Sequence, residues 1–192
     1  RSRPLIDAGT CSACFSSRLF ALKQSHAFYA RPFTKMKEDE NRVKIKLIAI
    51  NARYTHSCLA LFYLRQQLET HIDGVQVELC HYTINDPYYT LIQRIDQGNP
   101  DYVFFSALIW NSIMVERLLE DLTVMNKSCR YVVGGPQAPV LEKRFSGSER
   151  MTFFCGDIEA AEPGFFRDLV QGNPRFMYTG SFLKAGIDRL SY

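Results

Sequence analysis

The chain has 192 residues, of which 46% are hydrophobic and 22% are charged, with a formal net charge of +3. This length gives room for one domain of roughly 130–150 residues plus extensions, and no apolar run reaches the roughly 18 residues needed to cross a bilayer. Residues 1–35 hold six basic residues and one acid, a local charge of +5, so the total of +3 leaves −2 for the remainder. A folded part without excess positive charge argues against nucleic-acid binding.

Residues 1–42 have the composition of a poorly ordered, basic and charged extension. The sequence starts with Arg1 and not with methionine, and we expect a fragment of a longer protein. Many Ser and Arg residues with almost no acids fit a mitochondrial-type presequence over residues 1–35. Alternatively, Met36 is the natural start, followed by Lys37-Glu38-Asp39-Glu40, and the upstream residues are not part of the protein. We favour the second interpretation.

The six cysteines are scattered, mostly in apolar segments. This usage indicates small buried thiols in a reduced, cytoplasmic protein and argues against a disulfide framework. Cys11-Ser12-Ala13-Cys14 is a lone CxxC pair. A zinc site would need a second pair or histidines at ligand spacing, and a thioredoxin motif would need a preceding strand. We expect no metal site at this pair.

From residue 43 onward, apolar runs typical of strands alternate with segments of helical periodicity. Asp86-Pro87 favours a helix start, with Asp86 as the cap and Pro87 at the first helical position. The predicted elements, in chain order, are a strand over 43–50, a helix over 57–70, a strand over 75–80, a helix over 86–97, a strand over 102–106, a helix over 112–125, a strand over 130–133, a short helix over 140–145, a strand over 151–155 and a helix over 162–170.

This alternation predicts right-handed crossovers and a parallel sheet covered by helices on both faces. Nearly continuous apolar strands agree, because a sheet with one face in water would show alternating polar residues. We therefore predict an α/β, doubly wound, flavodoxin-like domain with a five-stranded parallel sheet over residues 43–172. Residues 173–192 follow as a linker.

The carboxyl ends of parallel strands share one edge of the sheet, where ligands bind. Ser106-Ala107-Leu108-Ile109-Trp110-Asn111 follows the third strand and contains the only tryptophan. Taken singly, such segments read as caps or turns: Thr55 or Ser57 can cap a helix, Gly134-Gly135 can form a turn, and Asp157 can cap the next helix. Together they predict a crevice lined by amides and an aromatic ring. The absence of GxGxxG and P-loop motifs argues against dinucleotides and nucleoside triphosphates.

The order of these motifs resembles the amino-terminal cobalamin-binding domain of cobalamin-dependent radical SAM enzymes. The matching segments are Asn51-Ala52-Arg53-Tyr54-Thr55-His56-Ser57, Tyr82-Thr83-Ile84-Asn85, Ser106–Asn111 and Gly134-Gly135-Pro136. The resemblance implies cobalamin held across the carboxyl edge of the sheet, as the only partner predicted. It implies that Ser106, Trp110, Asn111, Gly134, Gly135 and Pro136 line the corrin and its nucleotide tail. It also places Asn51, Tyr54 and His56 beside the cofactor, with Gly156 and Glu159 as further contacts.

Two departures from the family pattern limit this resemblance. Where the family often has Gly-Glu-Gly-Glu, this chain has Gly156-Asp157-Ile158-Glu159 and lacks the second glycine. The CxxxCxxC triplet that would hold an iron–sulfur cluster does not occur in the 192 residues. S-adenosylmethionine and a 4Fe-4S cluster would then belong to a missing downstream domain, and we expect no catalysis from this chain alone. The alternative is a non-catalytic flavodoxin-like interaction or flavin-binding domain.

His56 is a candidate lower ligand for cobalt, because imidazole suits such metals. Cobalamin carriers that use histidine have DxHxxG after the first strand, whereas this chain has Tyr54 at the Asp position and Leu59 at the Gly position. The missing carboxylate would have oriented the ring. We therefore do not expect His56 to bind cobalt and predict a non-coordinating side chain, such as Trp110, near the lower face of the corrin.

Overall fold

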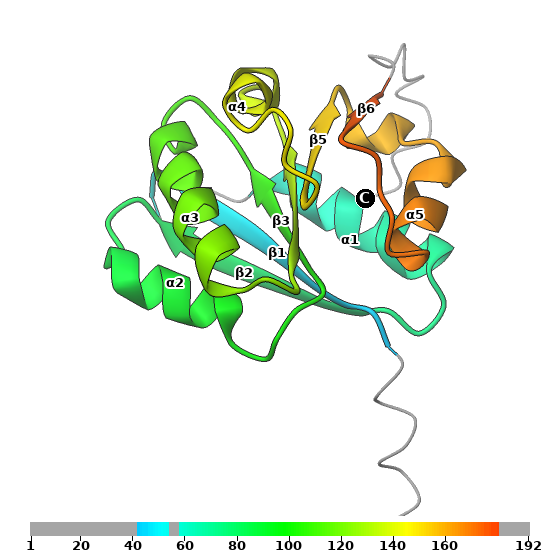
Figure 1. Cartoon of the computed structure of the whole chain (residues 1–192), viewed down its shortest axis with the longest axis horizontal. Coiled ribbons are helices and arrows are strands. Elements are labelled where there is room, and N and C mark those ends of the chain that lie inside the picture. The colour runs from blue at the N-terminus through cyan, green and yellow to red at the C-terminus, as the bar shows by residue number, and fades with distance from the viewer. Residues whose placement is uncertain (1–41, 54–57, 181–192) are drawn as a thin grey trace, which may run out of the picture. The chain divides into compact units, whose positions relative to one another are not determined.

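The structure is a computed structural model that describes residues 42–53 and 58–180 (Figure 1). The predicted extension therefore lies outside the described residues, apart from Arg42. The elements, in chain order, are β1 (Lys44–Asn51), α1 (Leu59–His71), β2 (Gln76–Thr83), α2 (Tyr88–Asp96), β3 (Tyr102–Ser106), α3 (Ser112–Met125), β4 (Arg130–Gly134), α4 (Ala138–Arg144), β5 (Met151–Cys155), the 3₁₀ helix η2 (Ile158–Ala160), α5 (Pro163–Val170) and β6 (Met177–Thr179).

The strands form one sheet in the order β2-β1-β3-β4-β5-β6, and every pair is parallel. The predicted α/β architecture is confirmed, but the sheet has six strands and not five. The additional strand, β6, pairs with β5, and Cys155 stands opposite Thr179. Three half-exposed residues at a sheet edge are too short to give a strand periodicity, which explains why the sequence analysis missed β6.

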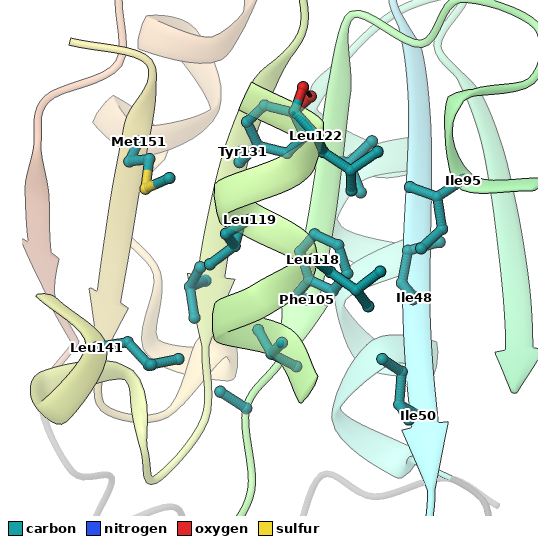
Figure 2. Packing of buried hydrophobic residues seen from close by; sticks show 14 of the residues in the cluster. Ile48, Ile50, Ile95, Phe105, Leu118, Leu119, Leu122, Tyr131, Leu141 and Met151 are labelled. Carbon is teal, nitrogen blue, oxygen red and sulfur yellow. Dashed lines mark hydrogen bonds between the residues drawn. The ribbon is translucent and has the colours of Figure 1, made fainter. Parts of the chain in front are cut away.

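Helices cover both faces of the sheet, as predicted. One face packs against α2, α3 and α4, where Leu118, Leu119 and Leu122 of α3 lie over Phe105 and other strand residues (Figure 2). The opposite face packs against α1 and α5. Burial on both faces explains the apolar strands, because water reaches neither side.

The turn between β2 and α2 differs from the prediction. Pro87 occupies the N-cap position, α2 begins at Tyr88, and no side chain caps the helix. The Asp86 carboxylate instead accepts hydrogen bonds from the Thr83 backbone N–H at 2.6 Å and from the Thr83 hydroxyl at 3.2 Å. Asp86 thus closes the turn that follows β2, a local bond that competes with helix capping.

The other predicted caps have different outcomes. Thr55 and Ser57 lie outside the described residues, and Cys58 occupies the N-cap position of α1. Asp157 occupies the N-cap position of η2, but its side chain makes no capping hydrogen bond there. Across residues 42–53 and 58–180, no helix has both the length and the apolar character needed to cross a membrane.

Candidate functional site

Two neighbouring strands, β3 and β4, end in a residue with a small side chain or none on the face that α1 and α5 cover, and a glycine follows β5. Side chains alternate along a strand, so Ser106 and Gly134 continue the face of the residues two positions earlier, and Gly156 follows the end of β5. Those earlier residues, Phe104 and Val132, belong with Phe154 of β5 to the core between the sheet and α1 and α5. Apolar packing therefore gives way to an opening at the carboxyl ends of β3, β4 and β5.

A cavity of about 560 Å³ occupies this place, within the roughly 300–1,000 Å³ range of small-molecule sites. Leu61 and Leu64 of α1 form the wall opposite the sheet. Its lining residues are Ala60, Leu61, Leu64, Phe104, Phe105, Ser106, Val132, Gly134, Gly135, Pro136, Pro139, Phe154, Cys155, Gly156, Asp157, Ile158, Glu159 and Thr179.

The cavity has an apolar inner layer and a polar mouth. Phe104, Val132 and Phe154 form the inner layer and are each at most 3% exposed. The polar side chains of the lining stand at the strand ends or beyond them; they are Ser106, Cys155, Asp157, Glu159 and Thr179. Phe104 and Val132 lie two strand residues, about 6.6 Å, below Ser106 and Gly134, whereas Phe154 lies closer to the mouth.

Two thiols border the mouth. The Cys58 thiol donates a hydrogen bond to the Ser106 hydroxyl, with 3.3 Å between sulfur and oxygen. Cys155 lines the cavity directly, and burial, with a smaller effect of the Glu142 carboxylate, raises the pKa of its thiol. Cys155 is therefore a neutral thiol at physiological pH, and it presents no charge to a ligand.

Glycine occupies the adjacent positions 134 and 135 for different structural reasons. Gly135 has a φ of +95°, and a Cβ there would lie 2.6 Å from the Ala107 carbonyl oxygen. The close approach of the loops after β3 and β4 therefore requires glycine at this position. Gly134 has no positive φ, and a Cβ there would meet nothing within 4 Å. The backbone would therefore accept another residue at position 134. The missing side chain of Gly134 leaves the cavity open.

Asn111 holds the loop after β3 in place. Its side chain is 1% exposed, and its Nδ2 donates to the Ile50 and Ser106 carbonyl oxygens at 2.9 and 3.0 Å. Its Oδ1 accepts from the Leu108 backbone N–H at 2.7 Å. The amide thereby ties together the ends of β1 and β3 and the loop that carries Trp110.

This loop and the first turn of α3 carry three exposed apolar side chains. Ile109 is 76%, Trp110 is 49% and Ile113 is 75% exposed. We call these three residues the apolar rim. They stand at the carboxyl edge of the sheet, but they do not line the cavity.

The cavity brings together six of the residues that the resemblance implied: Ser106, Gly134, Gly135, Pro136, Gly156 and Glu159. Asn51 ends β1 in a buried position, and its carbonyl oxygen accepts from the Ile84 N–H at 3.0 Å. Tyr54 and His56 lie outside the described residues. Within residues 42–53 and 58–180, no three His, Cys, Asp or Glu side chains gather as a metal site would require.

The sequence analysis missed the inner layer and the α1 wall. The signal for the inner layer was present in part, because Phe104 and Val132 each precede a predicted mouth residue by two positions on a strand. No comparable signal marked Leu61 and Leu64, since their helical spacing is that of any core-facing helix.

A second hollow, of about 320 Å³, lies at the amino ends of the strands, with Arg42, Asp101 and Arg130 in its lining. The Asp101 carboxylate accepts a hydrogen bond from the Lys44 N–H, and Arg130 donates to the Glu149 carbonyl oxygen. These contacts hold the loops before the strands in place. The hollow lies at the edge of the sheet opposite to the carboxyl ends of the strands, where the sequence predicts the site.

One solved structure, the crystal structure of a novel cobalamin-binding protein from Desulfitobacterium hafniense, is similar with 16% sequence identity and a TM-score of 0.45. That match covers 58% of this chain and 53% of the other chain. No curated protein matches the sequence significantly. The family model of the B12 binding domain matches residues 45–165, which include every residue of the cavity lining except Thr179. The chain therefore belongs to the B12-binding domain family.

Proposed function

We propose that this domain binds cobalamin, with the nucleotide tail in the cavity and the corrin over the carboxyl edge of the sheet. Membership of the B12-binding family supports cobalamin as the ligand. The main support from the geometry is Gly134. Its backbone conformation would accept a side chain, and the absence of one keeps the cavity open.

The chemistry of the lining fits a flat, uncharged base. Phe104, Val132 and Phe154 offer apolar contact to its ring, and the Ser106 hydroxyl can donate to a ring nitrogen at the mouth. The described lining holds two carboxylates and no Lys or Arg. A phosphate deep inside the cavity would therefore be unfavourable, so the phosphate of the nucleotide tail would stay outside the cavity while its base enters.

The apolar rim is the proposed support of the corrin. Trp110 and its neighbours Ile109 and Ile113 expose apolar area at the edge that a large ring above the cavity would cover. Asn111 holds this loop, and Asn51 packs at the end of β1. We propose Trp110 as a non-coordinating neighbour of the corrin, and no protein ligand from His56. The bound cobalamin supplies the group-transfer chemistry of its cobalt, whereas the protein binds and orients it.

We further propose that the domain serves as the cofactor-holding part of a cobalamin-dependent radical SAM enzyme. Support comes from the order of the motifs Asn51–Ser57, Ser106–Asn111 and Gly134–Pro136 in the sequence. The coding sequence downstream of Tyr192 tests this proposal. An in-frame CxxxCxxC motif is the expected result, and an unrelated domain there would contradict it.

Incubation of the chain with hydroxocobalamin, followed by desalting and an absorbance spectrum, tests cobalamin binding. The expected result is retention of the corrin bands at about one equivalent, with flavin mononucleotide lost in a parallel sample. A protein fraction without corrin absorbance would contradict the proposal, and retention of the flavin alone would favour the flavin-binding alternative.

A further inference from the structure

We propose that the cavity selects cobamides by the base of their nucleotide tail, favouring a base with an apolar outer edge over a purine. This inference rests on the proposed function, because it assumes that the tail enters the cavity. Its basis is the distribution of polar atoms along the depth of the cavity, which the strand register determines.

The inner layer offers no side-chain hydrogen bond. Phe104, Val132 and Phe154 come from three adjacent strands, and Leu61 and Leu64 face them from α1. All five side chains are hydrocarbon and at most 4% exposed. The backbone groups beside them already serve the parallel ladders of β3, β4 and β5. A polar atom placed at this depth would lose its water and find no new partner.

The Ser106 hydroxyl at the mouth does not reach Phe104 and Val132, the deepest residues of this layer. Phe104 pairs with Val132, and Ser106 pairs with Gly134 two residues further along both strands, whereas Phe154 lies level with Gly134. The rise of about 3.3 Å per strand residue puts Ser106 about 6.6 Å above Phe104 and Val132. That separation is more than twice the length of a hydrogen bond.

Two common bases differ at the edge that would enter deepest. Dimethylbenzimidazole ends in carbon atoms and two methyl groups, whereas adenine has two ring nitrogens and an exocyclic amine in its six-membered ring. The methyl groups suit the apolar inner layer. Each buried polar atom left without a partner costs about 1–3 kcal/mol. The cavity therefore discriminates against adenine even though both bases are flat and similar in size.

Titration of the chain with cobalamin and with the cobamide that carries adenine tests this inference. Binding is followed by the change in corrin absorbance. We expect cobalamin to bind at least about tenfold more tightly. Equal affinities, or tighter binding of the adenine form, would overturn the inference and leave the proposed function standing. If neither cobamide binds, the proposed function itself fails.

Val132 and Val133 provide a matched pair of variants. They are adjacent in β4 and equally buried, but Val132 faces the cavity and Val133 faces α3 and α4. Val132→Thr puts a hydroxyl into the inner layer and should lower the preference for cobalamin about two- to tenfold. Val133→Thr carries a similar stability penalty and should leave the preference unchanged. A preference that responds to neither variant, or to both alike, would contradict selection by the inner layer.

Discussion

Ser106 and Gly134 stand directly opposite each other at the last paired position of β3 and β4, and both line the same cavity. The loop after Ser106 is bonded to the other strand, because the Ala107 N–H donates to the Gly134 carbonyl oxygen at 2.8 Å. β3 thus places a hydroxyl at the mouth of the cavity, and β4 places no side chain beside it. The mouth of the cavity follows from this pairing, and substitutions around it should separate binding from folding.

Asn111→Ala should destabilise the domain by about 3 kcal/mol or more. The substitution removes three hydrogen bonds and leaves the Leu108 N–H and the Ile50 and Ser106 carbonyl oxygens without this partner. Urea unfolding followed by circular dichroism measures the change. Asn85→Ala, at an exposed position on the loop after β2, should change stability by less than about 0.5 kcal/mol. Equal effects of the two variants would contradict the role given to Asn111.

Gly135→Ala should destabilise the domain more than Gly98→Ala. Both glycines have positive φ values, +95° and +84°, so both alanine variants carry backbone strain of about 1–2 kcal/mol. Only at Gly135 does the new Cβ also meet the Ala107 backbone. Comparison of the urea midpoints tests the difference. An equally mild effect at both positions would mean that the loops after β3 and β4 separate easily.

Trp110→Ala should weaken cobalamin binding about tenfold while leaving stability nearly unchanged. The side chain is 49% exposed, so its contribution to the core is small, and a corrin over the apolar rim would bury the exposed half. Val124→Ala, 75% exposed near the far end of α3, is the control and should not affect binding. Unchanged affinity in Trp110→Ala would show that the corrin does not cover this residue.

Alkaline pH should destabilise the domain partly through Cys129. Burial is the main cause that raises the pKa of this thiol from 9.0 to about 12, so the folded state retains a proton that the unfolded state releases. The stabilising contribution is complete below pH 9 and is lost as the pH rises toward 12. Between pH 8 and pH 10, wild type should lose about 1.4 kcal/mol more than Cys129→Ala. Urea titrations at the two pH values measure this difference, and parallel losses would contradict it.

Much of the fold could be predicted because the strands are short apolar runs with polar or glycine boundaries. The strands over 102–106 and 151–155 and the helix over 112–125 have the predicted bounds. β6 escaped prediction because its place depends on pairing with β5 and not on its own pattern. The start of α2 was wrong because Asp86 bonds backward to Thr83, which helix propensity does not reveal.

The site was partly predictable for a related reason. Parallel topology puts all strand ends at one edge, so Ser106, Gly134 and Gly156 could be grouped from the sequence alone. The orientation of Asn111 could not be predicted, because its amide bonds to Ile50, 61 residues away in the chain. The α1 wall was also hidden, since only the three-dimensional packing reveals that Leu61 does not fill the space above Val132.

The most direct test of the account is the affinity of Gly134→Val for cobalamin compared with wild type. Valine fits the strand backbone, so the urea midpoint should stay the same or rise, whereas its side chain would enter the cavity. Gly164→Ala, at an ordinary backbone position in α5 away from the cavity, is the control for the loss of a glycine. We predict that Gly134→Val binds cobalamin at least about tenfold more weakly and that Gly164→Ala binds normally. A folded Gly134→Val protein with wild-type affinity would contradict tail insertion at this cavity.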